Sequence, residues 1–476
     1  MKKILFTLLV VYLFTADSTA QSFQVSLQSN FKSGIAYLTH HAGGNLSVED
    51  SAIVNEKGLA LFKGTRTLPP GIYAVVFPGK RITADFLLGG QKDIKISIKA
   101  DTTNLSQMQV TGSPENVLFQ EYQQFVSIKG KQLYQEKQAY INAGSAKDSA
   151  LHEAAYNKTN KELNDYRNDI IKNKPGSMMA IILNAMKEPP YPAKVPVTRQ
   201  DSLDNYQFYK AHYWDGITFM DEAVVRTPFF TPKLKRYYEE VMPQAADSII
   251  KDADYRLLLA RSAPEMYKYL LNWLTDQYIN PKYMGQDAVF VHLFEKYHSK
   301  GLSPWLNEKQ MEAITRRAYM LMSNLVGEKA ANLEMLDTAG KVSSLYDLKS
   351  NYTVVVFWDP NCGHCKEEMP RIDSIYRADW KKKGVQIYAV MSETDVEAWK
   401  KYINTNALTG WTHVYQSPER VKADADLQRP SFRQLYDVTQ TPTLYLLDSD
   451  KRIVGKKLTL EQLNDLLQVK WNASRK

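Results

Sequence analysis

Two cysteines, Cys362 and Cys365, lie in one short tetrad and are the residues of this sequence best suited to chemistry. No other cysteine occurs among its 476 residues. The first follows a strand-like apolar run, Thr353–Trp358, and the second opens a helix-like run, Lys366–Arg377. A Cys-X-X-Cys sequence at a strand-to-helix junction is typical of a site that exchanges thiols and disulfides.

The two cysteines are expected to have different roles. The thiolate is the attacking form in thiol–disulfide exchange, so the attacking cysteine needs a lowered pKa. Cys362 lies where the helix begins, and free backbone N–H groups there favour a negative charge. His364, two residues on, would add a positive charge when protonated. We therefore expect Cys362 to be the nucleophile and Cys365 the resolving cysteine, with a Cys362–Cys365 disulfide as the oxidised form.

Glu368 follows Cys365 by three residues, which places it beside that cysteine on the helix surface. A partly buried carboxylate there would accept the proton when Cys365 attacks. The alternative is a solvated helix glutamate, like Glu367 beside it. The residues themselves leave both interpretations open.

Thr441 and Pro442 directly precede a further strand-like run, Thr443–Leu447. A proline at a strand entrance can hold a cis peptide bond, which here would aim the Thr441 backbone toward a bound substrate chain. The alternative is an ordinary trans proline at a strand edge. With the Cys-X-X-Cys sequence upstream, we predict the cis bond.

Residues 327–476 resemble the TlpA/ResA-type branch of the thioredoxin superfamily. The resemblance is carried by Phe357-Trp358-Asp359-Pro360, Cys362-Gly363-His364-Cys365, Glu368-Met369-Pro370 and Thr441-Pro442-Thr443. It implies a thioredoxin fold, a cis Pro442 and a catalytic Cys362/Cys365 pair, and it favours a catalytic Glu368, because the ResA branch places a glutamate at this offset.

The same resemblance implies partners and supporting residues. Trp358, Pro360, Gly363, His364 and Thr441 would support the site. No cofactor is expected beyond the redox-active disulfide. The partners would be protein thiol or disulfide substrates, as in cytochrome c biogenesis, and a membrane-bound electron donor.

Three positions depart from the family pattern. Val356 stands where cytoplasmic thioredoxins carry a buried aspartate, and Asn361 stands where many relatives have tryptophan. The Gly363-His364 dipeptide matches protein disulfide isomerases, in which the histidine favours the thiolate and makes the pair more oxidising. We expect a reductase of protein disulfides or metallocofactor-site cysteines, with a disulfide oxidase or isomerase as the alternative.

Two other classes of function compete with the enzyme. A metal-binding or metallochaperone module would use Cys362, Cys365 and His364, but structural zinc usually takes four protein ligands, and no second ligand pair is evident. His292 and His298 are six residues apart, which is poor helical spacing for one metal. A substrate-binding envelope protein with a vestigial redox site is the other class, and the intact motifs argue against it.

The first residues predict export. Lys2 and Lys3 precede an apolar run, Ile4–Phe14, and the small residues Ser18-Thr19-Ala20 precede Gln21. This pattern is typical of a cleaved secretory signal at residues 1–20. The apolar run is too short to span a membrane, and no later run is long enough. We expect a protein of the periplasm or cell envelope without an integral membrane segment after cleavage.

Composition and pattern divide the rest of the chain. The formal charge of +8 is spread without a long basic run, so nucleic-acid binding is not expected. Residues 21–112 contain short β-branched and aromatic runs between turn signals, which predicts a small antiparallel sandwich. The predicted strands are 23–27, 52–54, 59–62, 72–77, 82–88 and 94–98.

Residues 113–326 have helical patterns, beginning with Ser113 as a cap before Pro114. The predicted helices are 115–143, 146–173, 178–187, 234–240, 245–260, 264–278, 287–300 and 308–325.

Residues 327–476 alternate strands and helices, which predicts an α/β fold. Besides a hairpin of 332–336 and 341–345, strand 353–358 and the helix that follows it, the predicted elements are strands 385–391, 411–415, 443–447 and 452–454 and helices 395–404, 431–436 and 460–469.

Overall fold

The computed structural model describes residues 23–91, 93–192 and 195–473. The predicted signal peptide, residues 1–20, lies outside these ranges, as does the mature start at Gln21. The chain packs into two compact units. The first contains the residues up to Val241 together with Leu259–Tyr267, and the second contains Met242–Leu258 and the residues from Lys268 onward.

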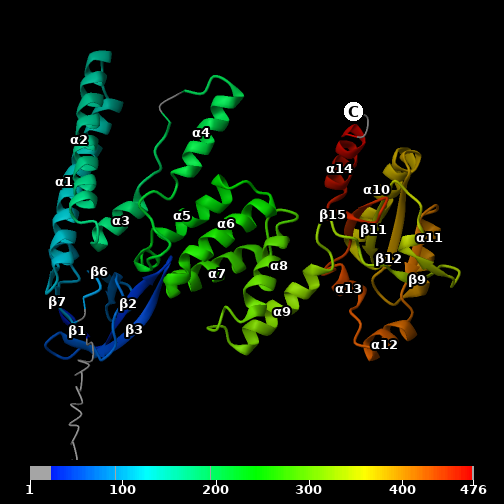
Figure 1. The fold of residues 1–476 in the computed structure, drawn as a ribbon, viewed down its shortest axis with the longest axis horizontal. Coiled ribbons are helices and arrows are strands. Elements are labelled where there is room, and N and C mark those ends of the chain that lie inside the picture. Colours follow the sequence, from blue (N-terminus) through cyan, green and yellow to red (C-terminus); the bar gives the residue numbers. More distant parts are fainter. Residues whose placement is uncertain (1–22, 92, 193–194, 474–476) are drawn as a thin grey trace, which may run out of the picture. The chain divides into compact units, whose positions relative to one another are not determined.

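The first unit begins with a β-sandwich of two four-stranded sheets, ordered β4-β1-β7-β8 and β3-β2-β5-β6 (Figure 1). Every second residue of β7 (Ile94–Ala100) is buried, as expected of a strand with one face on a core. The buried side chains of both sheets meet in one core that includes Phe62, Tyr73 and Phe86. The predicted N-terminal sandwich is therefore confirmed. The other strands are β1 (Phe23–Ser29), β2 (Ile35–Ala42), β3 (Asn45–Ile53), β4 (Leu59–Gly64), β5 (Gly71–Val76), β6 (Thr83–Leu88) and β8 (Gln109–Thr111).

The sandwich differs from the prediction in two respects. Strand β1 pairs with β7 in parallel, whereas the sequence predicts only antiparallel pairs. These two strands are far apart in the chain, and strand spacing carries no information on the direction of such a pair. Strands β2 and β8 and most of β3 were not predicted. No residue of β3 is fully buried, so the strand lacks the apolar alternation on which the prediction depends.

Two long helices follow the sandwich in the first unit, α1 (Pro114–Ile141) and α2 (Ala146–Asn173). They form an antiparallel hairpin, joined by the ion pairs Lys129–Glu162 and His152–Glu136 (Figure 1). Ser113 occupies the predicted N-cap position, but its side chain makes no capping hydrogen bond. The central helical class is confirmed. The further helices are α3 (Met178–Met186), α4 (Arg199–Ala211), α5 (Phe230–Arg236), α6 (Ala246–Leu259), α7 (Pro264–Ile279), α8 (Asp287–Lys296) and α9 (Glu308–Met322).

Helix α4 was not predicted from the sequence. It begins with a capping box in which the Thr198 side chain accepts from the Asp201 N–H while the Asp201 side chain accepts from the Thr198 N–H. None of its residues is fully buried. Its apolar periodicity is consequently weak, and the cap is the stronger local signal.

The second unit contains a seven-stranded sheet ordered β10-β9-β13-β12-β11-β14-β15. Its central strand β11 (Tyr352–Trp358) is parallel to β12 and antiparallel to β14. Val354, Val356 and Trp358 enter the core on one face, and Val355 and Phe357 enter the core on the other. Because both faces are covered, β11 is apolar along nearly its whole length.

Helices cover both faces of this sheet, which confirms the predicted C-terminal α/β thioredoxin fold (Figure 1). Helix α12 was not predicted, and none of its residues is buried. The predicted boundaries at 112/113 and 326/327 stay predictions. The remaining elements are β9 (Glu334–Asp337), β10 (Val342–Ser344), α10 (Gly363–Ala378), β12 (Val385–Met391), α11 (Val396–Thr405), β13 (Thr412–Tyr415), α12 (Pro418–Asp426), α13 (Phe432–Leu435), β14 (Thr443–Asp448), β15 (Ile453–Leu458) and α14 (Leu460–Ala473).

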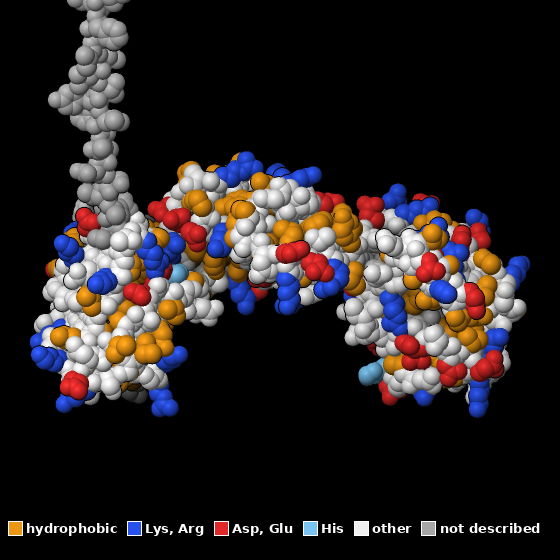
Figure 2. All heavy atoms as spheres, turned by 90° about the horizontal axis from the view of Figure 1, so that it is seen from below, with side chains coloured by type: hydrophobic (Ala, Val, Ile, Leu, Met, Phe, Trp, Pro, Cys, Tyr) orange, Lys and Arg blue, Asp and Glu red, His pale blue; other side chains and the backbone are white. Residues whose placement is uncertain are grey.

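Charge is distributed evenly over the surface that is visible in Figure 2. Lys and Arg side chains lie among Asp and Glu side chains on that face, rather than in one basic area. Among the described residues, no helix combines the length and the apolar character needed to cross a bilayer.

Candidate active site

The cysteine tetrad lies where β11 passes into α10. Cys362 is the N-cap residue of α10, in an extended conformation with φ −73° and ψ 127°. Its carbonyl accepts the first helical hydrogen bond, from the Lys366 N–H at 3.1 Å. The free N–H groups of the first helical turn therefore lie beside Cys362, as the sequence predicts.

The two cysteines are free thiols that differ in burial. Cys362 is half-buried, whereas Cys365 is fully buried in the core beside Met369. Burial raises the pKa of Cys365 to about 12. Burial also opposes ionisation of Cys362, but hydrogen bonds with Thr441 and with the N–H groups of Cys365 and His364 outweigh it, and the pKa of Cys362 is lowered. The Cys362 thiolate consequently forms at the lower pH of the two.

The segment that carries Pro442 lies against Cys362. The Thr441–Pro442 peptide bond is cis, which confirms the sequence prediction. The Cys362 thiol donates a hydrogen bond to the Thr441 carbonyl at 3.4 Å. The Thr443 hydroxyl donates to the Gln440 carbonyl at 2.6 Å and fixes the other side of this segment at the start of β14. A backbone carbonyl and a half-exposed sulfur are thus placed side by side.

The residues before the tetrad contact both cysteines, and the Asp359 carbonyl accepts from the Cys362 N–H at 3.2 Å. The Asp359 N–H donates to the Cys365 sulfur at 3.5 Å. The Asp359 carboxylate in turn accepts from the Asn361 N–H at 2.8 Å, which closes the turn into the helix. Trp358 and Pro360 are buried, and the Trp358 ring lies 5.4 Å from the ring of Tyr402. These side chains form the wall behind the cysteines.

Glu368 is partly buried and has an ion-pair partner. Its side chain is 25% exposed and forms an ion pair with Arg371, whose second nitrogen contacts Glu461 at 2.6 Å. The sequence analysis missed Arg371, although its spacing of three residues from Glu368 on a helix is a usable signal.

A cavity of about 430 Å³ joins Glu368 to Pro442. Its lining is mostly polar side chains and backbone from the segment before β14 and from the turn between β15 and α14. Pro442 lines this cavity and follows Thr441, which contacts Cys362, so the cavity lies beside the cis-proline segment. The lining residues are Glu368, Thr439, Gln440, Pro442, Thr443, Leu444, Lys457, Leu458, Thr459, Leu460 and Glu461.

Three further residues discussed from the sequence lie within the tetrad or in the strand before it. The His364 side chain is exposed, and it is its backbone N–H that favours the Cys362 thiolate. Val356, which stands where cytoplasmic thioredoxins have aspartate, is fully buried. Gly363 is the first residue of α10.

Histidines and cysteines do not gather into a metal centre. Within residues 23–91, 93–192 and 195–473, no three His, Cys, Asp or Glu side chains are grouped to hold a metal ion. His292 contacts Asp254 at 2.9 Å, whereas His298 lies between Thr275 and Ser303, at 2.8 and 2.9 Å. These two histidines therefore belong to separate hydrogen-bond groups.

Comparison with protein families matches three parts of the chain. The AhpC/TSA family matches residues 326–456. Two domains of unknown function, DUF5106 and DUF4369, match residues 155–324 and 23–119. The AhpC/TSA match contains the cysteine tetrad.

Individual relatives match the same C-terminal part. Thiol-disulfide oxidoreductase ResA of Bacillus thuringiensis (strain Al Hakam) is 30% identical over 147 residues, which cover 30% of this chain and 77% of the relative. ResA of Bacillus anthracis gives the same identity and coverage. A solved domain of a possible thiol-disulfide isomerase from Cytophaga hutchinsonii is 37% identical and covers 32% of this chain and 97% of that domain, with a TM-score of 0.28. The sequence matches to ResA confirm the resemblance that the motifs predicted.

Proposed function

The chain belongs to the ResA family of thiol-disulfide oxidoreductases, and we propose that its Cys362–Cys365 pair reduces protein disulfides in the cell envelope. One observation carries this proposal. The half-exposed Cys362 has a lowered pKa, and the buried Cys365 beside it has a raised one. An accessible nucleophile next to a protected second thiol is the arrangement that a two-step exchange requires.

In the first step, the Cys362 thiolate attacks one sulfur of the substrate disulfide. A bond forms between Cys362 and that sulfur, the substrate disulfide breaks, and the released substrate thiolate takes up a proton. In the second step, Cys365 loses its proton and attacks the Cys362 sulfur. The mixed disulfide breaks, the substrate leaves as a dithiol, and the enzyme is left with the Cys362–Cys365 disulfide. Two electrons pass from the enzyme to the substrate.

The second step needs a proton acceptor, since burial raises the pKa of Cys365 to about 12. We assign this role to Glu368, which lies one helical turn beyond Cys365. The ion pair with Arg371 fixes the position of the Glu368 side chain on the helix surface. We assign Arg371 the role of orienting Glu368.

The substrate chain is placed by the Pro442 segment. The Thr441 backbone lies against Cys362, and the next residue, Pro442, lines the cavity that also includes Glu368. We assign this cavity to the residues that flank the substrate cysteine. We assign a supporting role to Trp358 and Pro360, which lie before the tetrad, and to Gly363 and His364, which lie within it.

Export and regeneration complete the proposal. Residues 1–20 would be removed as a secretory signal, and the mature protein would work in the periplasm or cell envelope. A membrane-bound electron donor would return the disulfide to the dithiol, with no cofactor other than the disulfide itself. The mass of the intact exported protein tests the cleavage, since it should correspond to a chain that begins at Gln21.

Insulin reduction tests the activity. With dithiothreitol as reductant, the wild-type protein should accelerate precipitation of the insulin B chain, and Cys362→Ser should abolish the acceleration. An inactive wild-type protein that retains stoichiometric metal after dialysis would instead support the metal-binding module.

The same pair could work in the oxidising direction. The observation that favours an oxidase or isomerase is the lowered pKa of Cys362 next to Gly363-His364, because a stabilised thiolate makes the disulfide more oxidising. The reduction potential separates the two. A reduction potential of about −270 mV supports the reductase, and one of about −180 mV supports the isomerase.

A further inference from the structure

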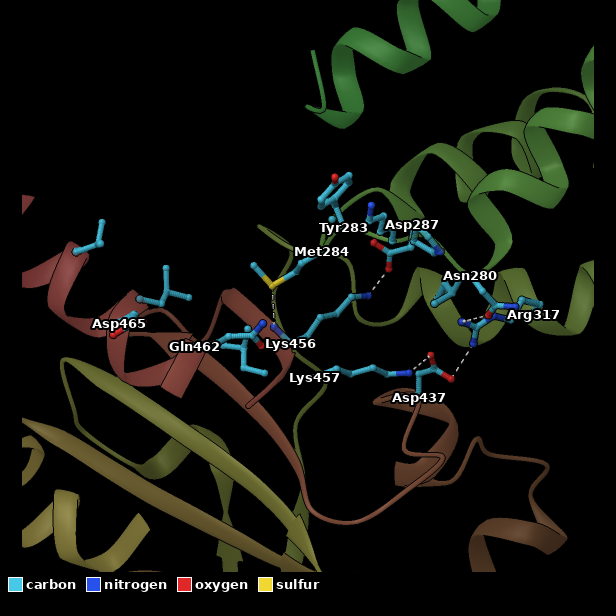
Figure 3. A pocket seen from close by; sticks show the side chains of 17 residues that line it. Asn280, Tyr283, Met284, Asp287, Arg317, Asp437, Lys456, Lys457, Gln462 and Asp465 are labelled. Atoms are coloured by element: carbon cyan, nitrogen blue, oxygen red, sulfur yellow. Dashed lines mark hydrogen bonds and ion pairs between the residues drawn. The ribbon is translucent and has the colours of Figure 1, made fainter. Parts of the chain in front are cut away.

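Arg317, Asp437 and Lys457 form an ion cluster on the wall of a cleft of about 710 Å³ in the second unit (Figure 3). Arg317 comes from α9, Asp437 follows α13, and Lys457 comes from β15. One Asp437 oxygen contacts Arg317 Nη1 at 2.8 Å, and the other contacts Lys457 Nζ at 2.6 Å. Both oxygens of one carboxylate are therefore held by cations from two different elements.

This carboxylate is more deeply buried than its partners. The Asp437 side chain is 1% exposed, against 21% for Arg317 and 38% for Lys457. Burial works to raise the pKa of Asp437, but the hydrogen bonds from Lys457 and Arg317 outweigh it, and the pKa is lowered. A buried charge that loses one of its partners is strongly destabilised, so the position of Asp437 depends on both cations.

The backbone at two of the three residues is in the left-handed region. Asp437 has φ 45° and Lys457 has φ 52°. Residues other than glycine adopt this conformation at a cost, and they keep it only where surrounding contacts hold them. The ion pair between their side chains is such a contact. Strained backbone of this kind is enriched near functional sites, and the segment that follows Asp437 leads to Thr441 beside Cys362.

Asp437 begins the short segment that reaches the active site. The segment runs from Asp437 to Thr441, whose carbonyl accepts the hydrogen bond from Cys362. Val438 is buried, and its N–H donates to the Arg433 carbonyl at 2.8 Å. At the far end, the Gln440 carbonyl accepts from Thr443. The segment is thus fixed at both ends, and Arg317 contributes to the end formed by Asp437.

Helix α9 touches the same region a second time. The Asn324 side chain, just after α9, donates to the Leu435 carbonyl at 3.1 Å. Lys456, the neighbour of Lys457, bonds to Asn324 and Asp287 rather than to Asp437. The two ion groups are therefore separate, and Arg317 is the residue of α9 that bears on Asp437.

We propose that Arg317 is a positioning residue for Cys362: through Asp437 it fixes the segment that holds Thr441, by both its backbone and its side chain, against the Cys362 sulfur. This inference rests on the proposed exchange at Cys362. It gives α9, which lies outside the residues matched by the AhpC/TSA family, a role in setting the reactivity of the cysteine pair.

The test is the pH dependence of Cys362 alkylation by iodoacetamide in the full chain, with the reduction potential as a second readout. Arg317→Ala should move the midpoint upward by about half a pH unit and slow alkylation at pH 7 about threefold, because the loosened segment no longer holds the Thr441 side chain, whose hydrogen bond helps to lower the pKa of Cys362. Arg317→Lys, which keeps the charge, should recover most of the change. Arg316→Ala is the matched control, since Arg316 is exposed on the same helix, and it should behave as wild type.

A folded Arg317→Ala protein with the wild-type profile and potential overturns the inference. If that variant does not fold, Arg317→Gln and Asp437→Asn replace it, with the same upward shift expected and an unchanged profile counting against the inference. A wild-type protein that titrates as an ordinary thiol and does not reduce insulin contradicts the proposed function itself. An active wild-type protein with unaffected Arg317 variants contradicts the positioning role alone.

Discussion

The sulfur of Cys362 lies 3.4 Å from the carbonyl oxygen of Thr441, the residue that precedes the cis peptide bond to Pro442. The two residues are 79 positions apart in the chain, and β11 and β14 bring them together as neighbours in one sheet. The contact involves the more exposed of the two cysteines, and Thr441 is among the residues that lower its pKa. The reactive thiol and the backbone that would receive a substrate chain are therefore one structural feature.

The two cysteines should titrate separately in the reduced protein. Since the pKa of Cys362 is lowered and that of Cys365 is raised to about 12, iodoacetamide should modify Cys362 with a midpoint below that of an ordinary thiol. Cys365 should stay unmodified throughout that range. Mass spectrometry of the modified peptides at a series of pH values measures both. Modification of Cys365 first, in the folded protein, would reverse the assignment of nucleophile and resolving cysteine.

Replacing Glu368 by Gln should slow the second step of exchange near neutral pH. Removal of a proton acceptor costs about a hundredfold or more in many enzymes, and about tenfold is expected here because water can reach the half-exposed site. Rapid-mixing kinetics of a preformed mixed disulfide on Cys362 isolate this step. Glu367→Gln is the matched control, since Glu367 is exposed on the same helix.

Arg371 gives an independent check on Glu368. Because the ion pair with Arg371 holds the Glu368 side chain in place, Arg371→Gln should slow the second step, but by less than Glu368→Gln does. A rate of the second step that is the same in wild type, Glu368→Gln and Arg371→Gln would return Glu368 to a purely structural role.

The parts of the site that sequence could predict are those encoded by neighbouring residues. The tetrad, the helix that it opens and the proline before β14 are local patterns, and each lies where it was predicted. The second partner of Arg371 and the α9 partner of Asp437 are of another kind. Glu461 is 90 residues from Arg371, and Arg317 is 120 residues from Asp437, so only the packed fold brings them together.

The same distinction applies to the fold. The apolar run of β11 predicts a strand covered on both faces, and the structure has one. The polar strand β3 and the exposed helix α12 have little apolar periodicity, and both were missed. These two elements are held by backbone hydrogen bonds and bury no apolar face. Without a buried face there is no apolar periodicity from which the sequence could predict them.

Acid should destabilise the C-terminal α/β part through His413. This side chain is 6% exposed, burial lowers its pKa to about 4, and its ring lies 6.3 Å from that of Trp358. Between about pH 6.5 and pH 4 the unfolded chain binds a proton that the folded protein does not, so stability falls as the pH is lowered through this window. The loss should reach about 3 kcal/mol at pH 4.

Urea unfolding followed by tryptophan fluorescence at pH 7, 5.5 and 4.5 measures this effect. His413→Phe should flatten the dependence over this range, whereas His364→Gln, which changes an exposed histidine of the same part, should leave it as in wild type. Equal slopes in all three proteins would assign the acid sensitivity to other groups.

The β-sandwich should be acid-sensitive at a lower pH, through Glu49. Its carboxylate contacts His40 at 2.7 Å and Arg66 at 2.5 Å, and its side chain is 10% exposed. The hydrogen bond from His40, with a further contribution from Arg66, outweighs burial and lowers the pKa of Glu49 to about 2. A depressed pKa contributes stability that is fully present above the unfolded value and is lost as the pH falls through the folded value.

Glu49→Gln should therefore cost about 2 kcal/mol at pH 7, less than the full shift implies, because the half-exposed Arg66 is screened by solvent. The difference from wild type should shrink as the pH falls below about 4.5, since both proteins then approach the same uncharged state. Scanning calorimetry at pH 7 and pH 3 compares the two, with the exposed Glu56→Gln as control. A deficit that is equally large at both pH values would mean that the amide disrupts packing, and that the charge of Glu49 contributes little.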